Sequence, residues 1–164
     1  MEESKMNTQY NINAIMCERA DEDVLHIDNI FNTIELEHEG TISFDVVTFL
    51  NCIGEPRDFN LIYMLQHVMD ENKGRVTFLS ATQYNYDKEC GEKNYTQNIE
   101  RTHYSGVNMD GKGKYVLVVY KYEEELLRQK GIDLQNDFED WISKLEDEKI
   151  AATYQFQVEI KRHK

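Results

Sequence analysis

The strongest constraint on the fold is a strict alternation of apolar and polar residues near the end of the chain. Tyr154, Phe156, Val158 and Ile160 alternate with glutamine and charged residues as far as Lys161. A period of two places the apolar side chains on one face of a β-strand, which has to be covered by other parts of the protein. The pattern therefore predicts a half-buried antiparallel strand over 154–160.

Strand patterns also dominate the first 122 residues. Strands are predicted over 11–17, 25–34, 42–53, 60–69, 75–84, 95–104 and 114–122. In the second, Leu25, Ile27, Phe31 and Thr33 are expected on one face. We expect the strand over 42–53 to be buried on both faces or bulged. The strand over 95–104 is expected at a sheet edge, and the strand over 114–122 is expected to be central. The turn around Pro56 predicts that 60–69 returns antiparallel to 42–53 as a long hairpin.

The spacing of the apolar residues changes between the strands predicted over 114–122 and 154–160. Residues 123–129 are helical in composition and are followed by Gly131. Leu134, Phe138, Trp141, Ile142 and Leu145 then lie on one helical stripe, with Asp133 placed to cap it. We therefore predict a mainly β fold, an antiparallel two-layer β-sandwich of about eight strands with one or two helices inserted before the last strand. Trp141 is expected to be buried against the sheet.

The chain has 164 residues, which is the length of about one domain. We expect residues 1–10 to form a flexible tail and 11–164 to form a single β-sandwich domain. The formal net charge of −13 argues against direct binding to nucleic acid or to an anionic membrane, because both require basic residues. No signal peptide or apolar run of bilayer length is present, so we expect a cytoplasmic protein.

Candidate reactive residues are sparse. Cys17, Cys52 and Cys90 are widely spaced, which favours neither disulfides nor a zinc site. Four positions were considered for metal binding, namely His26, His38 with Glu39, His67 and His103, and none has a ligand spacing. A nucleophile built from Cys17 or Cys90 with His26 or His103 has no support in the spacing. No nucleotide-binding glycine motif occurs, so we expect no cofactor, no metal and no enzymatic activity.

The acidic residues are the candidate functional feature. One region contains Glu18, the turn acids and Glu35, Glu37 and Glu39, and the other lies between 123 and 148. The candidate partner-binding residues are Asp21, Glu22, Asp23, Glu123, Glu124, Glu125, Asp137, Asp140, Glu146, Asp147 and Glu148. A protein with a basic surface is the expected partner, because opposite charge accelerates encounter. The alternative interpretation is a solvated shell that only keeps the protein soluble.

Three functional hypotheses follow. The first is a non-enzymatic, acidic protein-binding module, and the abundance of Ile, Asn, Lys, Glu and Tyr is typical of AT-rich bacterial or phage genomes. The second is a phage or mobile-element inhibitor of a bacterial nuclease, in which the acids imitate nucleic-acid phosphates. The third, with the least support, is an enzyme of unrecognised class.

Parts of the chain resemble a bacterial family of small β-sandwich proteins. The similarity lies in residues 13–20 with the acidic turn and 25–34 after them, in 113–120, and in 154–160. Members of that family open with a strand that ends in a Cys-acid pair, a short turn and a second apolar strand. The resemblance implies a sandwich fold and implies no activity. The helical segment 123–148 is longer than the family's pattern.

Overall fold

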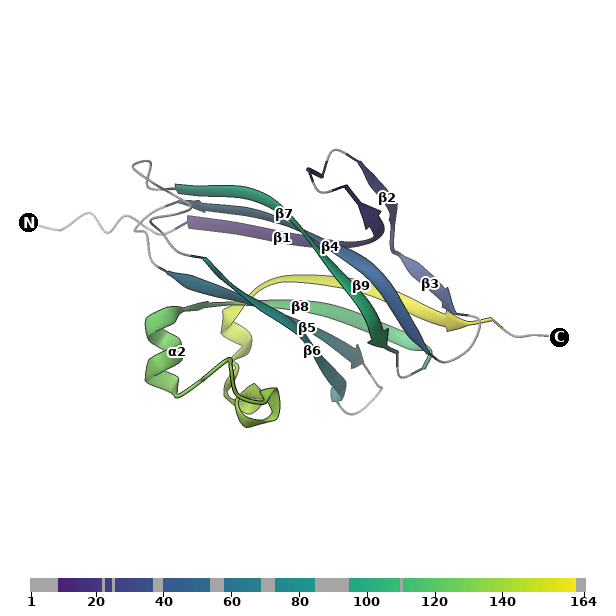
Figure 1. Ribbon diagram of the computed structural model, residues 1–164. Helices are drawn as coiled ribbons and strands as arrows, with labels where there is room; N and C mark the ends of the chain where they lie inside the picture. The colour runs from purple at the N-terminus through teal and green to yellow at the C-terminus, as the bar shows by residue number, and fades with distance from the viewer. Residues whose placement is uncertain are drawn as a thin grey trace, which may run out of the picture.

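The computed structural model contains two β-sheets that face each other across a common core (Figure 1). It describes residues 9–21, 23–24, 26–36, 40–53, 58–68, 73–84, 95–109 and 111–161. The four-stranded sheet has the order β2-β1-β4-β7, and the five-stranded sheet has the order β3-β9-β8-β5-β6. The strands are β1 (Gln9–Ala20), β2 (Ile27–Ile30), β3 (Thr33–Leu36), β4 (Thr41–Ile53), β5 (Phe59–Val68), β6 (Lys73–Tyr84), β7 (Tyr95–Asn108), β8 (Gly113–Glu123) and β9 (Ile150–Ile160).

The predicted β-sandwich is confirmed, with nine strands among the described residues. β8 is the central strand of its sheet and β7 is at an edge, as the sequence predicts. Residues 9 and 10 of the expected tail belong to β1, and residues 1–8 lie outside the described part.

The core lies between the inner faces of the two sheets. Phe44, Val46 and Leu50 of β4 pack in one apolar cluster with Leu61 of β5 and Phe156 of β9. Two pairs of hydroxyls join the sheets across this core: Thr48 and Tyr63 share a hydrogen bond of 2.6 Å, and so do Ser80 and Tyr104. A satisfied pair of this kind costs little, whereas either hydroxyl alone in the core would be unpaired.

The burial pattern of each strand follows from what covers its outer face. In β9, Phe156 is 2% exposed and Val158 is buried, whereas Gln155, Gln157 and Glu159 are exposed, so the predicted alternation is confirmed. In β5 every residue from 59 to 65 is buried, because a further layer covers the outside of the sheet there. β4 is buried on both faces from 44 to 48 and has a register shift between Ile42 and Phe44, also as expected.

The predicted hairpin between 42–53 and 60–69 is wrong. β4 pairs with β1 and β7, whereas β5 pairs with β6 and β8 in the other sheet. The connection at 54–58, of which only Asp58 is described, therefore carries the chain from one sheet to the other. Turn residues mark where a chain reverses, but they do not specify whether the returning strand pairs with the one before it.

The single predicted strand over 25–34 is also wrong. β2 and β3 are two strands of four residues in different sheets, and β3 runs parallel to β9, so the sandwich is not wholly antiparallel. Within β2, Asn29 has a φ of 52°, outside the extended region of the backbone. Of the residues expected on one face, Ile27 and Phe31 are partly buried and Thr33 is exposed, so these three do not share a buried face, and Leu25 lies outside the described residues.

The segment before β9 is less helical than predicted. Helix α2 (Glu124–Lys130) is confirmed, and it ends at Gly131, whose φ of 67° is suited to glycine. The predicted helix from Leu134 is wrong, because three short 3-10 helices are found instead: η2 (Phe138–Asp140), η3 (Ile142–Lys144) and η4 (Asp147–Lys149). Asp133 does not cap a helix. Its Oδ1 accepts a hydrogen bond of 3.0 Å from the backbone N–H of Gln135, which favours a turn.

Candidate acidic binding surface

The second acidic region forms a third layer outside the five-stranded sheet, and we call residues 123–149 the acidic layer. Figure 1 shows α2 and the short helices on the side of that sheet away from the four-stranded one. The layer contains ten acidic and four basic residues. Eight of the ten are exposed, namely Glu125, Asp133, Asp137, Glu139, Asp140, Glu146, Asp147 and Glu148, and Glu123 and Glu124 are partly exposed.

An apolar cluster holds the acidic layer against the sheet. Trp141 is 1% exposed, which confirms its predicted burial, and its ring meets Phe78 of β6 edge-on with centroids 5.3 Å apart. Ile62 of β5 and Leu127 of α2 belong to the same cluster. The stripe from Leu134 to Leu145 therefore faces the sheet as expected, although the backbone beneath it is not a continuous helix.

Polar contacts fix the two ends of the layer to each other. Lys130 Nζ and Glu146 Oε1 form an ion pair of 2.8 Å, and this bond raises the pKa of Lys130. The backbone N–H of Glu146 donates to Tyr122 Oη at 2.8 Å. Lys144 Nζ donates to the carbonyl of Gly131 at 3.0 Å. Two of the four basic residues of the layer are thus used within it.

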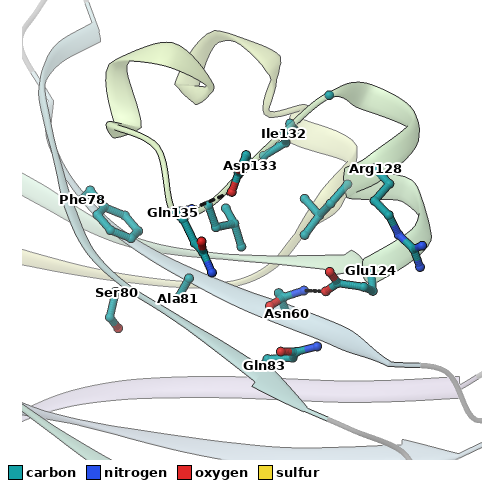
Figure 2. Close-up of a pocket in the computed structure, with 13 residues that line it drawn as sticks. Asn60, Phe78, Ser80, Ala81, Gln83, Glu124, Arg128, Ile132, Asp133 and Gln135 are labelled. Atoms are coloured by element: carbon teal, nitrogen blue, oxygen red, sulfur yellow. Dashed lines mark hydrogen bonds between the residues drawn. The ribbon is translucent and has the colours of Figure 1, made fainter.

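A pocket of about 730 Å³ opens between the acidic layer and the sheet. Phe78, Ala81 and Gln83 of β6 line one side, and the loop after α2 lines the other (Figure 2). Asn60 Nδ2 donates a hydrogen bond of 2.7 Å to Glu124 Oε2 at one end of the pocket. Glu124 is one of the residues that the sequence predicts for binding, whereas the pocket is not predictable from the sequence, because β5, β6 and the loop are far apart in the chain.

The first acidic region is not part of the same surface. Asp21 is partly buried, Asp23 is exposed, and Glu22 lies outside the described residues. Asp21 and Asp23 lie between β1 and β2, at the four-stranded sheet and away from the acidic layer (Figure 1). Glu35 is exposed on β3, whereas Glu37 and Glu39 also lie outside the described residues.

The structure also contains an Asp–His pair that the sequence analysis missed. The Asp45 carboxylate is buried on the outer face of β4, where it accepts hydrogen bonds from His103 Nδ1 at 2.6 Å and from the Ala20 N–H at 2.8 Å. The signal in the sequence was an aspartate inside the otherwise apolar run 42–50.

The cysteine and histidine candidates are not assembled for nucleophilic catalysis. Cys17 and His103 lie in one row across the sheet, but Asp45 of β4 separates them. The Cys17 thiol is buried, and burial raises its pKa, so it is held in the unreactive protonated form. His26 is exposed, and Cys90, His38 and the side chain of Cys52 lie outside the described part.

The remaining histidine has a structural role. His67 is buried and stacks on Tyr115 with ring centroids 4.3 Å apart, and the carbonyl of Lys112 accepts its Nε2–H at 3.1 Å. Within the described ranges, no three His, Cys, Asp or Glu side chains come together to hold a metal ion. None of the helices in those ranges is long and apolar enough to span a membrane.

Comparisons with known proteins yielded only distant structural similarity. No family model and no curated protein sequence matches the chain. The alkylpurine DNA glycosylase AlkC of Pseudomonas fluorescens, bound to DNA with an abasic site analogue, is 11% identical over 92% of this chain, with a TM-score of 0.46. This chain spans 30% of the glycosylase chain.

Two single domains give comparable or weaker matches. The CARDB domain of the PF1109 protein of Pyrococcus furiosus, in complex with di-metal ions, is 7% identical, with 98% of this chain and 100% of that one covered and a TM-score of 0.47. The N-terminal domain of PorA is 8% identical, with 90% and 97% covered and a TM-score of 0.26. All three TM-scores are below 0.5, and the similarities carry no functional argument.

Proposed function

We propose that this chain is a non-enzymatic protein-binding module that docks a partner with a basic surface on its acidic layer. The observation that supports the proposal is the exposure of eight of the ten acidic side chains of the layer. A concentrated negative field raises the rate of encounter with a positively charged partner. From the cysteine pattern and composition we also expect a cytoplasmic protein of bacterial or phage origin.

Rigidity supports binding rather than simple solubility. The layer is packed on the sheet through Trp141 and is joined by the Lys130–Glu146 ion pair, so the backbone that carries its carboxylates is in place before a partner arrives. A preformed surface loses less conformational entropy on binding than a flexible acidic tail does.

Affinity capture with charge variants tests the proposal. Wild-type protein on beads is incubated with bacterial lysate, in parallel with an acidic-layer variant in which Asp137, Asp140 and Asp147 are all changed to Asn. A control variant carries Asp28→Asn, Glu35→Gln and Glu159→Gln, which removes the same charge from exposed positions outside the layer. Bound proteins are eluted with salt and identified by mass spectrometry.

We expect a basic protein that wild type and the control variant retain, that the layer variant loses, and that salt elutes. A partner retained equally by all three proteins, or no specific partner, would contradict the proposal. A captured nuclease that this chain inhibits would instead favour nucleic-acid mimicry.

A further inference from the structure

Among the described strands, β6 lies at an edge of the five-stranded sheet. It is the last strand of the five-stranded sheet and pairs with β5 on one side, and no described strand pairs with its other side. Alternate residues of an edge strand direct their N–H and C=O groups outward, where an extended peptide can hydrogen-bond to them. Most side chains of β6 from 76 to 82 are partly exposed, so the strand is accessible along much of its length.

The pocket lies directly beside this edge. Phe78, Ala81 and Gln83 belong to β6 and line it, so a strand added to β6 would lie next to residues that line the pocket (Figure 2). Side chains of such a strand that point to the outer face of the sheet would enter it, because alternate residues share a face. A volume of about 730 Å³ is ample for one long side chain.

The charges around the pocket favour a basic side chain. Glu124 and Asp133 both line it, and their hydrogen-bond donors, Asn60 Nδ2 and the Gln135 N–H, are neutral. Neither carboxylate has a cationic partner within 4 Å among the described residues. Arg128 also lines the pocket, but two carboxylates and one guanidinium leave it negative.

The apolar residues that line the pocket suit the methylene groups of a lysine or arginine side chain. Phe78, Leu127 and Leu134 provide apolar contacts. Lysine and arginine pack their methylene groups on apolar surface while the charged end reaches polar partners.

We propose that the partner adds an extended segment along residues 76–83 of β6, on the side where no described strand pairs, and inserts a lysine or arginine side chain into the pocket, toward Glu124 and Asp133. This inference rests on the proposed function, because it specifies how a basic partner is held. It predicts recognition of a short peptide with one essential basic residue, beyond general attraction to the acidic layer.

Selection from a random peptide library displayed on phage tests the inference. Selected peptides are synthesised and measured by fluorescence anisotropy against wild type, against a pocket variant with Glu124→Gln and Asp133→Asn, and against a control with Asp28→Asn and Glu159→Gln, two exposed positions outside the acidic layer. Both pocket substitutions keep an oxygen for the existing hydrogen bonds, so the fold is preserved. Each peptide is also made with its lysine or arginine replaced by norleucine, and with alternate backbone nitrogens methylated.

We expect the pocket variant, the norleucine peptide and the methylated peptide each to bind about tenfold more weakly or worse, with the control much less affected. Hydrogen exchange should slow in β6 when peptide binds, and exchange in β7, an edge strand of the other sheet, should not change. Peptides that bind the pocket variant and wild type equally, that tolerate methylation, or that leave β6 exchange unchanged would overturn the inference. Failure to select any peptide would also overturn it, while capture of a basic protein by the acidic layer would still support the proposed function.

Discussion

The buried carboxylate of Asp45 is held by hydrogen-bond donors from the two strands beside it. Asp45 lies in a strand whose neighbours are almost all apolar, and it remains stable there because two donors reach its carboxylate. A buried carboxylate without partners would cost several kcal/mol. Asp45 thus links three strands, since Ala20 ends β1 and His103 lies on β7.

Replacement of Asp45 by alanine should lower the free energy of unfolding by about 2–3 kcal/mol, because the buried N–H of Ala20 loses its acceptor. His103→Gln keeps a donor at an exposed position and should change the free energy by less than about 1 kcal/mol. Urea denaturation followed by circular dichroism measures both. Equal effects of the two substitutions would show that Asp45 does not support the four-stranded sheet.

Tyrosines in the core make stability depend on alkaline pH. Burial raises the pKa of Tyr104 to about 12, and burial also raises that of Tyr63. The folded state therefore holds these protons more tightly than the unfolded state, whose tyrosine pKa is about 10. The contribution of these tyrosines to the free energy of unfolding is fully present below pH about 10 and is lost as the pH rises toward 12.

The free energy of unfolding, measured in urea across this range, should therefore fall with rising pH. Tyr104→Phe should reduce the slope, because one raised pKa is removed. If that variant has the same slope as wild type, Tyr104 does not contribute to the loss of stability.

At the scale of elements, periodicity predicts a strand well where one face is solvated. The outer face of β9 is exposed, so the alternation of apolar and polar residues predicts both where the strand lies in the sequence and which of its side chains are buried. The single strand predicted over 25–34 and the hairpin predicted around 54–58 are both wrong, because neither pattern contains information about which sheet a strand joins. The stripe from Leu134 to Leu145 identified the packed side chains, but a turn at 134–136 and three short 3-10 helices form there in place of a continuous helix.

Phe156→Asp tests the placement of the last strand. Phe156 lies in the main core, so a charge there should cost about 4 kcal/mol or more, or prevent folding. Gln157→Asp is the matched control, because the neighbouring side chain is exposed, and it should change the midpoint of thermal unfolding little. A Phe156→Asp variant as stable as this control would mean that β9 does not face the core.

At the scale of the whole molecule, the protein is a sandwich with a third, charged layer on one side. The acidic composition of residues 123–148 was visible in the sequence, and so was the burial of Trp141. The sequence does not show that the two acidic regions lie apart, because their separation depends on which sheet carries each region. The pocket was equally hidden, since β5, β6 and the loop after α2 meet only in the fold.

The central claim is that the acidic layer attracts a basic partner through its field. The most direct measurement is the association rate constant of the captured partner, determined by surface plasmon resonance at about 50 mM and about 500 mM NaCl. For wild type we expect the rate to fall about tenfold or more with added salt, because counter-ions screen the field, and we expect a much smaller fall for the Asp137/Asp140/Asp147 variant. A wild-type rate that does not change with salt, or that falls equally in the variant, would contradict the account.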